Sequence, residues 1–224
     1  MGSIGIRSTQ EIFEDIYRRK LWGGKKFFWR RFYSGSGSIG RDVIGPYLQA
    51  VIPLIRNRDV VDLGCGDFNV GKHLVKSAHH YVGCDIVRPL IERNRRKFRD
   101  VDFRTIDAVD DVLPDGDVVL VRQVLQHLNN KSVSKVLDKL TKYKFAIITE
   151  HIPLHEFVPN IDMPTGPGNR MQFDSGLVLS EPPFSFPVGK VLCEVAQHRG
   201  LIRTALHQFL PAAAGDMAGA GYNS

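Results

Sequence analysis

The stretch Val60-Val61-Asp62-Leu63-Gly64-Cys65-Gly66-Asp67 decides the fold of this chain. An apolar run that ends in a Gly-x-Gly turn, with helical spacing after it, predicts a buried strand that passes into a helix. Glycine at positions 64 and 66 lets a ligand approach the backbone closely, because neither residue carries a side chain. The sequence therefore predicts a ligand site at the carboxyl end of this strand, where doubly wound sheets bind nucleotide-like compounds.

Short apolar runs alternate with helical patterns on both sides of this turn. Two extended runs near the end of the chain, 190–197 and 201–210, predict an antiparallel hairpin that closes a sheet. Alternating strands and helices indicate an α/β fold with a parallel sheet covered by helices on both faces. The other expected strands are 81–85, 101–106, 117–121 and 145–149, and the expected helices are 9–33 with Thr9 as its cap, 41–55, 70–78, 89–98 and 132–140.

The 224 residues are expected to form a single domain, 1–210, followed by a disordered tail, 211–224. A proline-rich segment without regular spacing predicts a long functional loop. In chain order we expect an N-terminal helical cap (1–57), a ligand-binding core (58–150), a substrate loop (151–190) and the terminal hairpin (190–210).

Composition and charge exclude several classes of protein. Three widely spaced cysteines without a CxxC pair argue against a disulfide framework and a structural zinc site, and no metal is expected. No apolar run is long enough to cross a bilayer and no signal peptide is visible, so a cytoplasmic protein without membrane association is expected. The net charge of +6 comes from two basic clusters, 18–31 and 93–99, which indicate either attraction to a polyanion or solvated helix faces.

The carboxylates that follow the predicted strands indicate the kind of ligand. Asp62 and Asp67 place negative charge at the glycine turn, and Asn69 stands where a dinucleotide fold has its third glycine. Two carboxylates would repel pyrophosphate and would suit a cationic ligand. Asp85 ends the next strand, where a carboxylate accepts hydrogen bonds from ribose hydroxyls. Asp107 ends the third strand and suits an adenine amine. The ligand implied is a positively charged adenine nucleoside without phosphate.

This set of motifs resembles the class I S-adenosylmethionine-dependent methyltransferases, over roughly residues 40–210. The matching segments are DLGCG (62–66), YVGCD ending at Asp85, FRTID ending at Asp107, and VVLVRQVLQHL (118–128). The resemblance implies S-adenosyl-L-methionine as cofactor. It also implies a Rossmann-like, three-layer α/β/α fold, with a seven-stranded, mostly parallel sheet, an antiparallel last strand and a helical N-terminal cap.

The resemblance also implies roles for individual residues. In the family, the glycine turn and the first acid contact the methionyl part of the cofactor, the second-strand acid binds ribose and the third-strand acid binds the adenine amine. The N-terminal Ser/Gly segment is similar to one that covers the cofactor in a bacterial subgroup of small methyltransferases. The expected cofactor contacts are Asp62, Gly64, Cys65, Gly66, Asp67, Asn69, Asp85, Ile86, Asp107, Ala108, Gln123 and Ser38.

Histidines and carboxylates after the fourth and fifth strands are the candidates for catalysis. His151 is the first choice for a general base, because a neutral imidazole is available near pH 7. Glu150 is expected to orient His151 or to bind substrate, and His127 is a further candidate. Arg170 suits a carboxylate or phosphate on the acceptor. The expected substrate contacts in the loop are His155, Arg170 and Asp174.

The sequence predicts methyl transfer from S-adenosylmethionine to a small-molecule acceptor, at a hydroxyl of a sugar or secondary metabolite. One alternative is a nucleic-acid or protein methyltransferase that uses the basic N-terminal segment. Against a nucleic-acid amino group as acceptor, residues 122–125 read RQVL, without an Asn-Pro-aromatic-aromatic string. A non-catalytic domain that binds the cofactor is a further alternative, and a nicotinamide oxidoreductase is disfavoured by Asp67 and Asn69. Nothing in the sequence indicates an oligomeric state.

Overall fold

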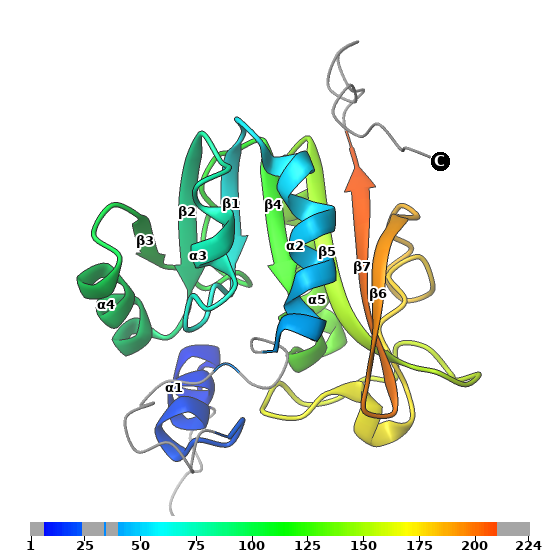
Figure 1. Cartoon of the computed structure of the whole chain (residues 1–224). Helices are drawn as coiled ribbons and strands as arrows, with labels where there is room; N and C mark the ends of the chain where they lie inside the picture. Colours follow the sequence, from blue (N-terminus) through cyan, green and yellow to red (C-terminus); the bar gives the residue numbers. More distant parts are fainter. Residues whose placement is uncertain (1–6, 24–33, 35–39, 210–224) are drawn as a thin grey trace, which may run out of the picture.

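A single seven-stranded sheet forms the centre of the molecule in the computed structural model, which describes residues 7–23, 34 and 40–209 (Figure 1). The strand order is β3-β2-β1-β4-β5-β7-β6. β1 to β5 are parallel, and β7 pairs antiparallel with both β5 and β6. The strands are β1 Asp59–Leu63, β2 His80–Asp85, β3 Asp102–Thr105, β4 Val118–Arg122, β5 Phe145–Pro153, β6 Lys190–Gln197 and β7 Gly200–Gln208.

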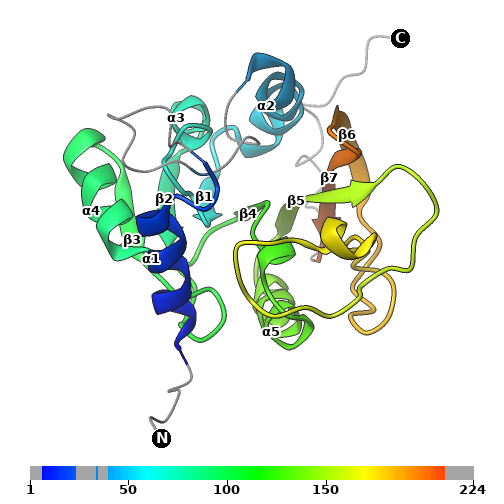
Figure 2. The same cartoon turned by 90° about the horizontal axis from the view of Figure 1, so that it is seen from below.

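Helices cover both faces of the sheet, because successive side chains of each buried strand point to opposite sides. On β4, Val119 and Val121 join the core beneath α5, whereas Val118 and Leu120 join the core beneath α2 (Figures 1 and 2). The predicted three-layer, Rossmann-like fold is confirmed. The helices are α1 Thr9–Arg19, α2 Arg41–Ile55, α3 Gly71–Leu74, α4 Arg88–Lys97 and α5 Asn130–Leu140, with 3₁₀ turns η2 Leu125–His127 and η3 Arg170–Phe173.

The N-terminal helix is shorter than the sequence pattern predicts. Ser8, not Thr9, caps α1, through a capping box with Glu11. The helix ends at Arg19, because Lys20 adopts a left-handed conformation and its N–H bonds Ile16 and Tyr17 carbonyls. Residues 24–33 lie outside the described residues, as do the predicted tail from 211 and Ser38.

Two further elements differ from the predicted bounds. The helix expected over 70–78 contains only Gly71–Leu74 as regular helix. β5 continues to Pro153 instead of ending at residue 149, because β7 pairs with it along its whole length, from Phe145 to Pro153. Glu150 and His151 therefore lie within a strand and not in the loop after it.

The carboxyl ends of the parallel strands face α1 and the yellow loop that carries η3, which both lie below the sheet in Figure 1. This edge is where ligands bind in open α/β sheets. None of the helices described is both long and apolar enough to pass through a membrane.

Candidate functional site

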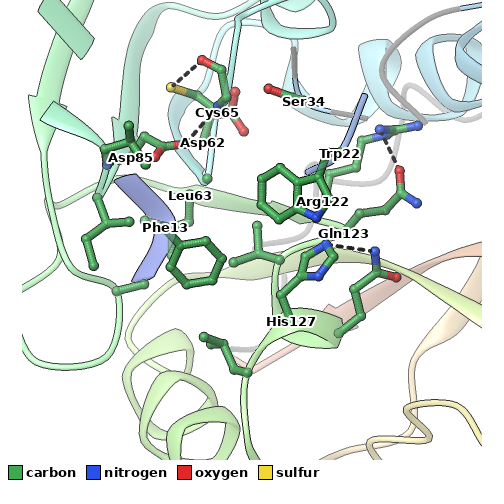
Figure 3. A pocket seen from close by; sticks show the side chains of 18 of the residues that line it. Phe13, Trp22, Ser34, Asp62, Leu63, Cys65, Asp85, Arg122, Gln123 and His127 are labelled. Atoms are coloured by element: carbon green, nitrogen blue, oxygen red, sulfur yellow. Dashed lines mark hydrogen bonds between the residues drawn. The ribbon is translucent and has the colours of Figure 1, made fainter. Parts of the chain in front are cut away.

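A cavity of about 700 Å³ lies at the carboxyl ends of the central strands. Its lining comes from the ends of β1 to β4, from α1, and from the loop around residues 167–171 (Figure 3). Volumes of roughly 300–1,000 Å³ are typical of small-molecule and cofactor sites. The acidic residues that the sequence places at the ends of the first three strands thus meet in one cavity.

The backbone conformation of the turn requires glycine at positions 64 and 66, as does close approach of a ligand. Gly64 and Gly66 have φ of 70° and 57°, in the left-handed region that favours glycine. A Cβ on Gly64 would lie 2.3 Å from Cγ2 of Val124, and one on Gly66 would lie 2.4 Å from Oγ of Ser34. Both residues line the cavity, so the turn leaves no space for any side chain.

Asp85 ties the end of β2 to this turn. Its carboxylate accepts hydrogen bonds from the N–H of Gly66 and the N–H of Val87, both at 3.0 Å. Burial raises the pKa of Asp85 to about 6, although the bonds from Val87 and Gly66 lower it. A carboxylate has about four acceptor sites, so Asp85, which lines the cavity, keeps capacity for ligand hydroxyls.

Asp62 is the second buried carboxylate of the cavity wall. It accepts a hydrogen bond from the Tyr81 hydroxyl at 2.7 Å. Burial raises its pKa to about 6; the bond from Tyr81 lowers it, and the nearby Asp85 raises it further. A positively charged ligand group would stabilise the ionised forms of both Asp62 and Asp85.

Asp67 and Asn69 are hydrogen-bonded to each other just after the glycine turn. The Asp67 carboxylate accepts hydrogen bonds from the Asn69 N–H at 3.2 Å and from its amide at 3.0 Å. Asp67 lines the cavity, whereas Asn69 is not part of the described lining. The N–H of Asp67 donates to Ser34 at 2.8 Å. Ser34, the first residue of the Ser/Gly segment, therefore meets the turn, whereas Ser38, the expected cofactor contact of that segment, lies outside the described residues.

The remaining predicted cofactor residues all line the cavity: Cys65, Ile86, Asp107, Ala108 and Gln123. Burial raises the pKa of Asp107, and its carboxylate accepts the Val109 N–H at 2.8 Å. Gln123 has a φ of 56° and accepts a hydrogen bond from Arg122 at 3.1 Å. Burial raises the pKa of the Cys65 thiol well above its ordinary value, so it stays protonated.

His151 and His127 both line the cavity, but they differ in which ring nitrogens are hydrogen-bonded. His151 Nε2–H donates to the Gln197 carbonyl at 3.1 Å, which leaves Nδ1 as the unprotonated nitrogen in the neutral ring. His127 Nδ1–H donates to the Gly168 carbonyl at 2.8 Å, and its Nε2 accepts from Gln126 at 3.2 Å. Burial lowers the pKa of His151, and it lowers that of His127 to about 4. Both rings are therefore neutral near pH 7.

Glu150 and Arg170 lie beneath the cavity wall and are not among its described lining residues. The Glu150 carboxylate accepts the N–H of Gln126 at 3.0 Å, at the start of η2. The Arg170 guanidinium donates to the carbonyl of Leu128 at 3.0 Å, just past the end of η2, and to Oδ1 of Asn130 at 2.7 Å. Glu150 thus bonds the backbone at the beginning of η2, and Arg170 bonds the backbone just past its end. The two side chains thus form a clamp on η2.

None of the three expected substrate contacts belongs to the described lining of the cavity. Arg170 is only 1% exposed and its guanidinium bonds the protein's own backbone, so it does not reach an acceptor. His155 and Asp174 form an exposed pair at 2.9 Å, outside the described lining of the cavity. The sequence identified the loop, but burial and pairing within the loop depend on the tertiary fold.

The free energy of unfolding of the native chain should decrease between about pH 6 and about pH 9. In Glu150→Gln this decrease should be smaller. Burial raises the pKa of Glu150 to about 8, and Arg170 partly opposes this. A carboxyl whose pKa is raised in the folded state contributes stability below its unfolded pKa, and this contribution is lost as the pH rises through the folded value. Glutamine keeps an acceptor for Gln126 but cannot ionise. Urea unfolding at both pH values tests this, and equal pH dependence in the two proteins would contradict it.

Aromatic side chains of the N-terminal segment form the roof of the cavity, and Phe13, Tyr17 and Trp22 all belong to its lining. The centroid of the Trp22 ring lies 5.3 Å from that of Tyr17, 6.0 Å from that of Phe13 and 4.8 Å from that of His127 (Figure 3). Its indole N–H donates to the Pro167 carbonyl at 2.9 Å. Trp22 therefore joins the N-terminal segment to the loop 145 residues later. The only signal in the sequence was the aromatic character of the basic N-terminal cluster.

The donor chemistry of the site fits S-adenosylmethionine. Four carboxylates line the cavity, at the ends of β1, β2 and β3 and in the glycine turn, and they suit a cationic nucleoside. In the part of the chain that the structure describes, no group of three His, Cys, Asp or Glu side chains could hold a metal ion.

Comparisons with known proteins point to the same class. Residues 61–143 match the protein-family model described as "Methyltransferase domain". No curated protein sequence matches the chain. Among solved structures, the N-methyltransferase NodS from Bradyrhizobium japonicum WM9 with S-adenosylhomocysteine is 12% identical, with 87% of this chain and 98% of that chain covered and a TM-score of 0.58.

A second solved structure is similar over almost its whole length. Magnesium protoporphyrin IX methyltransferase from Synechocystis PCC 6803 with bound SAM is 14% identical, with 91% of this chain and 98% of that chain covered and a TM-score of 0.56. Identities this low show a shared fold. Residues 61–143 carry a methyltransferase domain, and this domain, the acidic crevice and the shared fold support an S-adenosylmethionine-dependent methyltransferase.

Proposed function

We propose that this enzyme transfers the methyl group to a hydroxyl of a small molecule, such as a sugar or secondary metabolite. The observation that carries the proposal is the bond from Trp22 to Pro167, because it joins the N-terminal segment to the loop over the cavity. A partly covered, aromatic-lined cavity of about 700 Å³ favours a small acceptor over a polymer segment.

The cofactor residues are proposed to act from the strand ends. Asp85 would accept hydrogen bonds from ribose hydroxyls, Asp107 one from the adenine amine, and Asp62 would attract the positively charged methionyl end. Gly64 and Gly66 would allow the ligand to lie against the backbone. When bound, S-adenosylmethionine supplies a methyl group already activated on sulfonium, so much of the remaining work is alignment of the acceptor.

His151 is proposed as the general base. Its Nε2–H is held by the Gln197 carbonyl, so the Nδ1 lone pair is the site that would take the acceptor's hydroxyl proton. Its lowered pKa keeps the ring unprotonated at neutral pH. The Gln126 side chain accepts the His151 backbone N–H at 3.3 Å, and Glu150 in turn accepts the backbone N–H of Gln126 at 3.0 Å.

The function is tested by incubating the protein with S-adenosylmethionine and measuring S-adenosylhomocysteine release by mass spectrometry. A panel of small hydroxyl compounds is compared with RNA, DNA and a protein mixture. Turnover confined to small hydroxyl compounds would support the proposal. Turnover confined to a polymer, weakening steeply with salt, would favour the nucleic-acid or protein alternative.

Replacing His151 with glutamine is expected to lower kcat by about 10²–10⁴-fold, because glutamine cannot take the proton. The amide can still donate to the Gln197 carbonyl, so affinity for S-adenosylhomocysteine should stay unchanged in calorimetry. In the native enzyme kcat should fall as the pH drops through the His151 pKa, and the variant should lose this dependence. His73→Gln, an exposed histidine on α3, is the control. An unaltered rate in His151→Gln would remove it as the base.

A further inference from the structure

Arg122, at the end of β4, is a half-buried cation, and two of its three guanidinium nitrogens have no hydrogen-bond partner among the described residues. It lines the cavity, and its Nη1 donates to Gln123 at 3.1 Å (Figure 3). Its Nε and Nη2 are buried and have no hydrogen-bond partner among the described residues. An arginine stays charged in a protein, and a buried charge without a partner is unfavourable. The structure therefore carries a cation that lacks its anion.

The surroundings of Arg122 do not supply that anion. Its guanidinium lies over the Tyr47 ring, 5.0 Å from the centroid. Burial lowers the pKa of Arg122, while Tyr47 and Asp62 raise it. Asp62 is near enough to interact electrostatically, but its carboxylate is bonded to Tyr81, and the two form no direct ion pair in the described part of the chain.

Arg122 and Asp62 thus present one positive and one negative group on the same wall of the cavity. They project from adjacent strands, β4 and β1, whose register pairs Asp62 with Leu120, two residues before Arg122. Both side chains lie on the α2 face of the sheet, because their neighbours Val60, Val118 and Leu120 pack into the core beneath α2. Such a pair is complementary to an α-amino acid group, whose ammonium and carboxylate are separated by a single carbon.

From this arrangement we propose that Arg122 binds the carboxylate of the cofactor's methionyl group while Asp62 faces its ammonium. The proposal rests on the proposed cofactor site and adds a residue to it. Planar guanidinium donors suit a carboxylate in two parallel hydrogen bonds, and Nε and Nη2 are one such edge of the group. Arg122 would be a binding residue, and it would distinguish the complete cofactor from adenosine compounds without the amino acid group.

The test compares two ligands by calorimetry on the full chain: S-adenosylhomocysteine and the same compound without its carboxylate. In Arg122→Met, affinity for S-adenosylhomocysteine should fall about 10- to 100-fold, as expected for loss of hydrogen bonds to a charged group. Affinity for the decarboxylated compound should change by less than about twofold. Retained binding of this compound also shows that the variant is folded. Arg122→Lys, which keeps the charge, should lose less. Lys131→Gln, an exposed lysine on α5, should change neither affinity.

Equal losses for both ligands in Arg122→Met would overturn the proposal, because the effect would then not involve the carboxylate. Unchanged affinity for S-adenosylhomocysteine would also overturn it and would leave the cofactor site itself intact. If the native chain binds neither ligand, the proposed cofactor site fails first, and the proposal fails with it.

Discussion

Gly66→Val is expected to abolish binding of S-adenosylhomocysteine, with a loss of more than about 100-fold in affinity. Gly66 has a φ of 57°, a conformation that β-branched residues rarely adopt. Its Cβ would meet the Ser34 oxygen at 2.4 Å, and the turn lines the cavity at this point. The backbone would have to move, and the Gly66 N–H would leave the Asp85 carboxylate, which it bonds at 3.0 Å. Isothermal titration calorimetry measures the loss.

The matched control is Gly45→Val on α2. Nothing lies within 4 Å of the place where its Cβ would be, and its φ is not in the left-handed region. This variant should bind the ligand like the native chain. Circular dichroism establishes that both variants are folded. Tight binding retained in Gly66→Val would refute the argument that the backbone at this turn must be bare.

Arg170→Met is expected to lower the free energy of unfolding by about 2–4 kcal/mol. Arg170 is almost completely buried and bonds Leu128 and Asn130 at the end of η2. Methionine fills a similar length but leaves those oxygens without a donor. Unsatisfied buried polar groups are costly, so η2 and the cavity wall above it should loosen together.

Urea unfolding of the full chain measures this effect. Arg199→Met is the control: Arg199 is exposed at the cavity mouth, and its substitution should change the free energy of unfolding by less than about 0.5 kcal/mol. If Arg170→Met unfolded like the native chain but raised KM for the acceptor, the clamp would be wrong and the substrate contact inferred from the sequence would be restored.

The sequence located the central strands to within a residue or two because their signals are local. β1 and β2 are short, mostly apolar runs that end at a glycine turn or an acid. These end signals can be recognised without knowledge of distant residues. The order of acids at the strand ends then indicated a cationic nucleoside site. All the acids singled out for that site, Asp62, Asp67, Asp85 and Asp107, do line one cavity.

Other features depended on partners far away in the chain. β5 continues to Pro153 only because β7 pairs with it, and this moved Glu150 and His151 into the sheet. Trp22 lies in the roof because of a bond to Pro167, and Ser34 meets the glycine turn through the N–H of Asp67. No local pattern predicts such contacts.

What the sequence predicts and what only the tertiary structure decides differ in how far apart along the chain the interacting residues lie. Hydrophobic periodicity, turn glycines and terminal acids are properties of short segments, so the α/β fold and its cofactor edge could be read along the chain. Whether a charged side chain meets solvent, ligand or another buried group is settled only when distant segments pack. That is why Arg170 proved to be part of a buried clamp, and why the unsatisfied Arg122 became visible only in three dimensions.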